Sequence, residues 1–316
     1  MEEVNMRKEE ISFESRDGAS SIYAVKWIPD ETPKAILQIT HGMAEHIGRY
    51  EDFATYMCEH GFMVIGDDHL GHGRTLHINE GKPGYICAKH GDTVMVRDEH
   101  RLKKIVQGEN PGIPIFILGH SMGSFILRNY MYRYGTGING AIVMGTGMQP
   151  RALLAVSRAI AAISGFVLGD DHIPTLLNSM AFGAYNKRIP DAKNDYEWLS
   201  KVDEVQQKYI ADSDCGFTFT VNGFKVLFKL IWKLTDKANV EKMPRNLPVF
   251  MVSGEEDPVG NYGEAVKQVY ESYKALGMED VTLKLYKDDR HEILNETDHD
   301  QVYEDILNWI EAHISA

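Results

Sequence analysis

One serine lies in a pattern that leaves this chain few choices of fold. Residues 115–118 are four consecutive apolar residues, and a Gly-x-Ser-x-Gly sequence centred on Ser121 follows them directly. Short apolar runs predict buried strands, and only small residues fit two positions before and after a serine where a strand reverses sharply into a helix. The pattern predicts a strand, a turn that lifts the Ser121 hydroxyl above the sheet, and a helix whose first N–H groups lie beside it.

Short apolar runs alternate with helical stretches along most of the chain. Two early runs, at residues 11–15 and 21–28, predict a hairpin. Further runs lie at residues 35–40, 62–65, 115–118 and 141–144, with helical stretches between them at 50–60, 93–107 and 122–134. Such alternation is typical of a parallel sheet covered by helices on both faces. We therefore predict an α/β fold with a mostly parallel central sheet.

The alternation stops between residues 148 and 240, which contain helical stretches but no clear buried strand. Strand-like runs resume at residues 249–252 and 281–286, and an amphipathic helix is expected over 301–312. This divides the chain into a core formed by residues 1–147 and 241–316, and a mostly helical cap formed by residues 148–240. Ligands of open α/β sheets bind at the carboxyl ends of the strands, so we expect the cap to cover that edge.

The composition excludes some classes of protein. A net charge of −13 over 316 residues argues against binding to nucleic acid. The three cysteines (Cys58, Cys87 and Cys215) follow no metal-ligand spacing, which favours free thiols in a reducing compartment. The first ten residues lack the apolar core of a secretory signal, so we expect a cytoplasmic protein. The most apolar segment, residues 152–168, contains Arg158 and predicts a packed or surface helix rather than a membrane span.

A serine hydroxyl becomes a nucleophile only beside a base that a carboxylate orients. In a sheet of this kind the nucleophile, the acid and the histidine follow in that order, each after a strand. His291 follows the run at 281–286, whereas His299 and His313 fall in the final helical stretch. We therefore predict that Ser121 is the nucleophile and His291 the base.

Three carboxylates follow the run at 249–252. They are Glu255, Glu256 and Asp257. We prefer Asp257 as the acid because it lies deepest in the loop and Pro258 holds it in an extended conformation. The negative oxygen that forms when serine attacks a carbonyl needs backbone N–H donors. We assign these donors to Met122, directly after the serine, and to Met43, in the loop after residues 35–40.

Five segments together resemble the monoacylglycerol lipase and lysophospholipase branch of the α/β-hydrolases, which is often grouped with the serine aminopeptidases. They are residues 41–50, 68–73, 119–123, 254–258 and 290–293. The resemblance implies the α/β-hydrolase fold, a Ser121–Asp257–His291 triad and an oxyanion hole formed by Met43 and Met122. It also places Glu45 and Arg49 near the polar, alcohol-side end of the pocket. The chain departs from the lipases at Met43-Ala44, where smaller residues are common.

A metal site and an aspartate nucleophile are two alternatives to this interpretation. Six residues (His41, His46, His69, His72, Asp67 and Asp68) could be imagined as a metal cluster, but their spacing matches no His-x-His-x-Asp-His or His-Glu-x-x-His pattern. We predict neither a metal nor a cofactor. A hydrolase of the haloalkane or epoxide type would need an aspartate nucleophile at position 121, where this chain has serine.

The cap contains two apolar segments, residues 152–168 and 224–234, which either pack on the core or line an acyl pocket. Four lysines recur every four residues on or just after the second segment (Lys225, Lys229, Lys233 and Lys237). They form either a solubilising face or a site for transient contact with an anionic membrane surface.

The sequence thus predicts a serine hydrolase that cleaves single-chain acyl esters of small molecules or lipids through an acyl-enzyme. An aminopeptidase-type peptidase would instead need cap carboxylates to bind a free amine, and five are available: Asp170, Asp171, Glu197, Asp203 and Glu204. A carboxylesterase for small esters and a binding protein on a hydrolase scaffold are the remaining alternatives.

Overall fold

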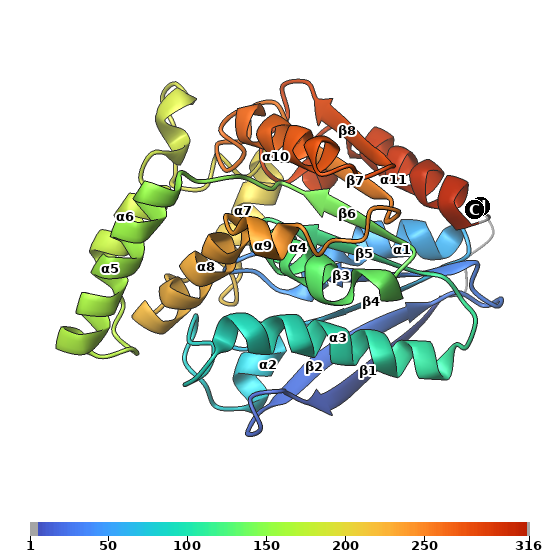
Figure 1. The fold of residues 1–316 in the computed structure, drawn as a ribbon, viewed down its shortest axis with the longest axis horizontal. Coiled ribbons are helices and arrows are strands. Elements are labelled where there is room, and N and C mark those ends of the chain that lie inside the picture. The colour runs from blue at the N-terminus through green and yellow to red at the C-terminus, as the bar shows by residue number, and fades with distance from the viewer. Residues whose placement is uncertain (1–5, 315–316) are drawn as a thin grey trace.

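An eight-stranded β-sheet runs through the computed structural model, which describes residues 6–314 (Figure 1). The strands are β1 (Arg7–Glu14), β2 (Ser21–Ile28), β3 (Ala35–Thr40), β4 (Phe62–Asp67), β5 (Ile115–His120), β6 (Gly140–Met144), β7 (Val249–Gly254) and β8 (Val281–Tyr286). Their order across the sheet is β1-β2-β4-β3-β5-β6-β7-β8. Only the β1–β2 and β2–β4 pairs are antiparallel. The predicted hairpin and mostly parallel sheet are confirmed.

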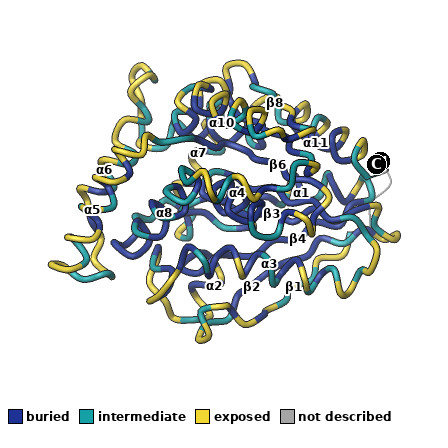
Figure 2. Tube along the Cα trace, in the orientation of Figure 1, coloured by how far each residue is buried: buried dark blue, intermediate teal, exposed yellow. Residues whose placement is uncertain are grey.

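The central strands are buried over their whole length, as their apolar sequences require. Every residue of β3, β4, β5, β6 and β7 is buried, whereas the edge strands β1 and β8 are partly exposed. Figure 2 shows this as a dark-blue centre bordered by exposed segments. Strands buried on both faces cannot alternate polar and apolar residues, and this explains the uninterrupted apolar runs.

Helices cover both faces of the sheet. Residues of α1 (Glu51–Glu59) and α11 (His299–Ile314) contribute to one hydrophobic cluster, and those of α3 (Gly91–Glu109), α4 (Met122–Tyr134) and α10 (Glu264–Ala275) to the other. The short elements are α2 (Gly73–Ile78), η1 (Ile47–Tyr50), η2 (Gly135–Gly137) and η4 (Ile293–Asn295).

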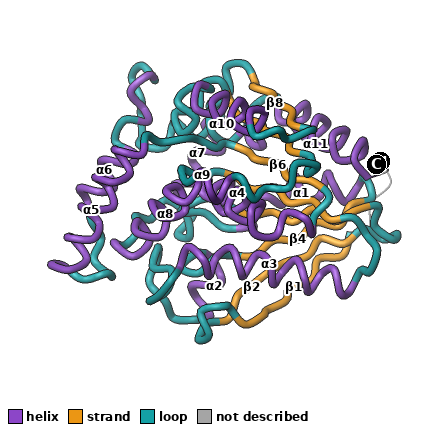
Figure 3. The backbone as a smooth tube through the Cα atoms, in the orientation of Figure 1, coloured by secondary structure: helices purple, strands orange, loops and turns teal. Residues whose placement is uncertain are grey.

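Only helices and loops lie between β6 and β7 (Figure 3). The helices are α5 (Arg151–Leu168), α6 (Thr175–Phe182), η3 (Tyr185–Arg188), α7 (Asp203–Ala211), α8 (Val221–Leu234) and α9 (Lys237–Val240). The α5–α6 pair projects beyond the carboxyl ends of the strands (Figure 1). By contrast, α8 buries most of its residues and packs on α3, α4 and α5. The α8 helix, although it lies in this segment, is therefore part of the hydrophobic core.

The α5 helix is buried along one narrow stripe, formed by Leu154, Ser157 and Ala161. Its other apolar side chains face outward, and Phe166 is 92% exposed. Within residues 6–314 it is the one helix long and apolar enough to cross a membrane by length and composition alone, and 17% of it is buried. In this structure α5 packs on α8 and forms part of the outer surface, in agreement with the predicted surface helix.

The lysines of α8 and α9 are paired with carboxylates of the same chain. Lys229 lies 2.9 Å from Asp92, and Lys233 also contacts that carboxylate. Lys225 pairs with Asp170, and Lys237 lies 3.6 Å from Glu241. Because Asp92 is buried at the start of α3, two of these lysines fasten α8 to the core.

Candidate active site

Ser121 lies at the sharp turn between β5 and α4, as the sequence predicts. Its φ of 53° falls in the left-handed region, which a non-glycine residue rarely adopts. A Cβ atom at position 123 would lie 1.9 Å from the Thr40 carbonyl oxygen, and one at position 119 would lie 2.4 Å from the Gly123 oxygen. The two glycines of the motif are therefore needed for β3, β5 and α4 to approach this closely.

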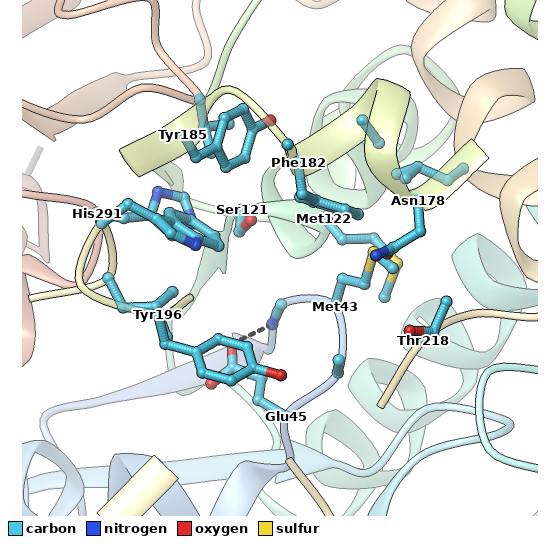
Figure 4. A pocket seen from close by; sticks show the side chains of 18 of the residues that line it. Met43, Glu45, Ser121, Met122, Asn178, Phe182, Tyr185, Tyr196, Thr218 and His291 are labelled. Carbon is cyan, nitrogen blue, oxygen red and sulfur yellow. Dashed lines mark hydrogen bonds between the residues drawn. The ribbon is translucent and has the colours of Figure 1, made fainter. Parts of the chain in front are cut away.

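Asp257 and His291 come from different loops and meet below the cavity. His291 Nδ1 lies 2.9 Å from Asp257 Oδ2, and both side chains are buried. The other Asp257 oxygen accepts the Val259 N–H at 2.8 Å, and Ser253 donates to Oδ2 at 3.2 Å. A carboxylate held in this way fixes the proton on Nδ1, which leaves Nε2 free to act as a base. Figure 4 shows His291 beside Ser121, and both line the cavity.

The other carboxylates considered for the acid lie elsewhere. Glu255 and Glu256 are exposed, whereas Asp257 is fully buried at the end of β7. His299 and His313 are on α11, remote from the cavity lining. The structure therefore brings together Ser121, Asp257 and His291.

Two backbone N–H groups of the residues beside Ser121 have no hydrogen-bond partner within residues 6–314. Met122 begins α4, so its N–H has no partner inside the helix. Within residues 6–314 no hydrogen bond occupies the Met43 N–H, and both methionines line the cavity. Gly42 allows the Met43 loop to approach, since a Cβ there would lie 3.2 Å from Ser121 Cβ and 2.5 Å from Glu45 Oε1.

Glu45 is the centre of a buried polar network below this loop. Its Oε1 accepts the Gly42 N–H at 2.6 Å and the Tyr50 hydroxyl at 2.9 Å. His120 Nδ1 lies 3.3 Å from the same oxygen. Burial acts to raise the pKa of Glu45, but the hydrogen bond to His120 and the charge of Arg49 hold it well below its ordinary value. Glu45 therefore carries a negative charge directly beneath the Met43 loop.

Arg49 lies behind the cavity rather than on its wall. Its guanidinium donates two parallel hydrogen bonds to Glu292, each 2.7 Å long, and a third to Glu45 at 2.9 Å. Glu45 and Glu292 line the cavity, but Arg49 does not. The resemblance anticipated Glu45 and Arg49 at the polar end of the pocket; only Glu45 lies there directly.

The network extends to the loop that carries His291, and no sequence pattern predicts this connection. His120 Nε2 lies 3.2 Å from the His291 carbonyl oxygen, and Glu292 follows His291 in the chain. Two opposing effects act on the pKa of the buried His120. Burial lowers its pKa, but Glu45 outweighs this and raises it. The Met43 loop, the Ser121 turn and the His291 loop are thus fastened to one buried group of charges.

The cavity above Ser121 has a volume of about 440 Å³. One wall is apolar and comes from α4, α5, α6 and α8; it includes Phe125, Leu153, Leu154, Phe182, Leu227, Phe228 and Ile231. Polar and aromatic residues line the cavity as well, including Tyr185, Asn186, Asp195, Tyr196 and Trp198. Figure 4 shows Met43, Phe182, Asn178 and Thr218 on one side of Ser121, and Tyr185 and Tyr196 flanking His291 on the other.

The six residues considered as a metal cluster do not converge on one point. His46 pairs with Asp212 at 2.9 Å, and Asp68 accepts the N–H groups of Ile47 and Arg74. Within residues 6–314, two sets that include some of these residues bring their possible ligand atoms within 4.8 Å of one another: His46, Asp212 and Cys215, and Asp67, His69 and Glu99. Burial and the neighbouring Asp67 raise the pKa of Glu99 well above its ordinary value.

Comparisons with known proteins agree with this geometry. A sequence model of the family described as "Serine aminopeptidase, S33" matches residues 31–298. A monoacylglycerol lipase from Mycolicibacterium smegmatis is 28% identical over 315 residues, covering 98% of this chain and 100% of that protein. The human monoglyceride lipase is 28% identical over 291 residues, covering 90% and 84% of the two chains.

A solved structure has nearly the same fold. The crystal structure of a highly thermostable carboxyl esterase from Bacillus coagulans in complex with glycerol superposes with a TM-score of 0.91 at 31% identity, covering 98% of this chain and all of that one. The chain is therefore an α/β-hydrolase of the serine aminopeptidase S33 family, and the monoacylglycerol lipases are among its relatives.

Proposed function

We propose that this protein hydrolyses single-chain acyl esters, such as monoacylglycerols and lysophospholipids, through an acyl-enzyme on Ser121. The observation that carries the proposal is the position of Ser121: it lies beside His291 in a cavity of about 440 Å³ that apolar side chains of α4, α5, α6 and α8 also line. The relatives of the chain show that it is a carboxylic ester hydrolase, and the nucleophile that we assign to it is Ser121. The finer assignment of substrate rests on the shape and lining of the cavity.

The first step is acylation of Ser121. Its hydroxyl oxygen attacks the ester carbonyl carbon while His291 Nε2 takes the hydroxyl proton. Asp257 holds the imidazolium that forms, through the 2.9 Å contact with Nδ1. The Met43 and Met122 N–H groups then bind the negative oxygen of the tetrahedral intermediate. Collapse of the intermediate passes the proton from His291 to the departing alcohol.

The second step is hydrolysis of the acyl-enzyme. A water molecule enters beside His291, which removes one of its protons as the oxygen attacks the acyl carbon. The oxyanion forms again at Met43 and Met122, and the proton returns to Ser121 as the fatty acid leaves. Every bond change uses groups of this chain and water, so no cofactor is required.

The cavity lining supports an acyl substrate with one chain and a polar alcohol. Apolar side chains of α4, α5 and α8 provide the surface that an acyl chain would cover. Polar groups that also line the cavity, such as Asn186, suit the hydroxyl groups of a glycerol moiety. Glu45 and Glu292 are engaged with Arg49, so they shape the site rather than present a free charge to an alcohol.

The five cap carboxylates that a peptidase could use do not line the cavity within the described chain. Asp170 pairs with Lys225, Asp171 with Lys82, and Glu204 with Lys208. A carboxylate that holds its own lysine is poorly suited to bind the amino group of a peptide. For these five residues the arrangement supports an ester rather than a peptide substrate, whereas Asp195 does line the cavity.

We also propose that the protein is cytoplasmic and contacts membrane or micelle surfaces transiently through α5 and α6. Nine large apolar side chains of this cap region are exposed: Leu153, Val156, Ile163, Phe166, Val167, Leu168, Ile173, Leu176 and Met180. A patch of this kind lies flat on a lipid interface and would bring the cavity mouth to its substrate. The lysines of α8 contribute less, since they are paired within the chain.

The proposed cytoplasmic location is supported by the three cysteines. They are buried and unpaired, as is typical of proteins in a reducing compartment.

The test compares p-nitrophenyl esters from acetate to palmitate, followed by monoacylglycerol, lysophosphatidylcholine and an amino-acid anilide, with Ser121→Ala as the control. We expect activity that increases toward medium or long chains, extends to the two lipids and disappears in the variant. Activity confined to the shortest esters would indicate a small-ester carboxylesterase. Serine-dependent cleavage of the anilide alone would indicate a peptidase, and absence of all serine-dependent activity would leave a binding scaffold.

A further inference from the structure

His41 is a buried histidine next to the catalytic groups, yet it does not reach the cavity. It lies between the end of β3 and Gly42, its side chain is fully buried, and it is not among the residues that line the cavity. It cannot therefore touch the substrate, and the mechanism above gives it no role. Its hydrogen bonds nevertheless reach the peptide group that carries the Met43 N–H.

The proton of the His41 ring can be assigned from its partners. The backbone N–H of His69 points at His41 Nε2 over 3.0 Å, and a backbone N–H can only donate. His41 Nε2 must therefore be the acceptor. Burial, together with the nearby His69 and His72, holds the pKa of His41 well below its ordinary value, so the ring is neutral. A neutral ring with an unprotonated Nε2 has its proton on Nδ1.

That Nδ1–H donates to the Gly42 carbonyl oxygen over 2.7 Å. The Gly42 carbonyl and the Met43 N–H belong to the same peptide group. In a trans peptide these two bonds point in opposite directions, and the described chain contains no cis peptide. Fixing the carbonyl toward His41 therefore fixes the Met43 N–H toward the other side, where Ser121 lies.

A second contact holds the preceding peptide. The Gly42 N–H donates to Glu45 Oε1 over 2.6 Å, so Gly42 is held at its nitrogen by Glu45 and at its oxygen by His41. Glycine has the widest backbone freedom of any residue, so both contacts are needed to give this segment one conformation. A preorganised donor stabilises an oxyanion because it does not have to rotate into place during the reaction.

Contacts with His69 in turn hold the ring of His41 in place. His69 stacks on it with ring centres 3.9 Å apart, and His69 Nε2 lies 3.2 Å from the His41 carbonyl oxygen. The other nitrogen of His69 lies 3.6 Å from Asp67 and 3.5 Å from Glu99. All four side chains are buried, so water does not compete for these contacts.

We propose that His41 is a positioning residue of the oxyanion hole, which acts by holding the Gly42–Met43 peptide so that the Met43 N–H faces the developing negative oxygen. The inference rests on the proposed ester hydrolysis and deepens it. It assigns a role in transition-state stabilisation to a residue that touches neither the substrate nor the other catalytic side chains.

A matched pair of variants separates this role from simple packing. In His41→Asn the amide nitrogen occupies nearly the place of Nδ1, so the donor to the Gly42 oxygen is retained. In His41→Gln the amide reaches instead toward the Nε2 position, and that donor is lost. His72→Gln is the control, because His72 is buried in the same cluster but its Nδ1 contacts the Leu70 carbonyl oxygen.

The readout compares an ester with its thionoester, in which sulfur replaces the carbonyl oxygen and accepts hydrogen bonds poorly. Wild-type protein should hydrolyse the oxygen ester much faster. We expect His41→Gln to lower kcat for the oxygen ester by about 10- to 100-fold with little change in KM, and to reduce the ratio of the two rates. His41→Asn should retain most of the ratio, and His72→Gln should leave it unchanged.

Two outcomes would overturn the proposal. If His41→Gln slows both esters equally, His41 supports the fold but not the oxyanion hole. If His41→Asn and His41→Gln behave alike while both remain folded by circular dichroism, the Nδ1 contact is not the important one. A wild-type protein without Ser121-dependent hydrolysis would instead refute the proposed function, so the two failures are distinguishable.

Discussion

Single side chains determine whether Ser121 can react. The serine is held in a strained conformation by a turn that only glycine-flanked sequences can form, and the reaction depends on the proton positions of two histidines, His291 and His41. In each case one hydrogen bond selects the tautomer. Replacing one acceptor or donor at these positions should therefore change the rate without changing the fold.

Asp257→Asn tests the tautomer of His291. An amide in place of the carboxylate can donate to Nδ1, which would move the ring proton to Nε2 and leave no base for Ser121. We expect kcat for a p-nitrophenyl ester to fall by about 10³- to 10⁴-fold with KM changed only slightly. Glu256→Gln, an exposed neighbour in the same loop, is the control and should match wild type. A loss of less than tenfold in Asp257→Asn would argue against Asp257 as the acid.

Asp289 makes a testable contribution to the pH dependence of stability. Burial raises its pKa to about 6 despite its contact with Lys201, whereas the unfolded chain has a value near 3.8. Because the folded state holds the proton more tightly, folding takes up a proton between about pH 4 and pH 6, and stability falls as the pH rises through that window.

The variant Asp289→Asn removes this dependence. We expect it to increase the free energy of unfolding at pH 8 relative to wild type, by at most about 3 kcal/mol, and to have a much smaller effect at pH 4. Urea unfolding at both pH values measures the difference. A variant that is less stable than wild type at pH 8 would contradict the assignment.

At the scale of elements, the structure follows the sequence closely where burial dictates the pattern. The predicted helix at 122–134 coincides with α4, and the strand predictions at 35–40 and 281–286 coincide with β3 and β8. Strands buried on both faces and the glycine-flanked turn leave a strong local signal. The order of the motifs was also enough to anticipate which acid and histidine meet.

Contacts between distant elements left no such signal. Nothing in the spacing of the α8 lysines indicates that Asp92, more than 130 residues earlier in the chain, is their partner. The pairing of Arg49 with Glu292 and the inward packing of α8 are of the same kind. These depend on how elements pack in three dimensions, which a periodic pattern does not encode.

Asp92→Asn tests how α8 is held. The buried carboxylate accepts from both Lys229 and Lys233, so its loss leaves two ammonium groups without a counterion. These lysines are partly exposed, so we expect a destabilisation of about 1–3 kcal/mol. Differential scanning calorimetry measures it, and Glu241→Gln, whose partner Lys237 is exposed, should have little effect. Equal effects of the two variants would contradict a specific role of Asp92.

We expect the exposed face of α5 to contact lipid. Replacing Phe166 and Val167 by serine removes two outward side chains that are 92% and 68% exposed. We expect binding to phosphatidylglycerol vesicles to fall at least severalfold while hydrolysis of a short, soluble ester stays unchanged. Co-sedimentation measures binding. Replacing Lys225, Lys229, Lys233 and Lys237 by glutamine should weaken it less; the reverse order would place the contact on the lysines.

The molecule consists of a buried catalytic part, which is built on the sheet, and a cap that is more exposed. The sheet and the buried Glu45–Arg49–Glu292 network fasten the three loops that carry Met43, Ser121 and His291. Above them, α5 is buried along a single stripe and presents apolar residues to its surroundings. This division suits an enzyme whose chemistry needs fixed geometry and whose substrate arrives from a lipid surface.

The measurement that tests this account most directly is mass spectrometry of the protein quenched in acid during turnover of a long-chain p-nitrophenyl ester. We predict a mass increase equal to one acyl group, located by peptide mapping on Ser121 and absent in Ser121→Ala. An acyl group on another residue, or rapid Ser121-dependent turnover by a protein that forms no covalent adduct even under rapid quenching, would contradict the acyl-enzyme mechanism.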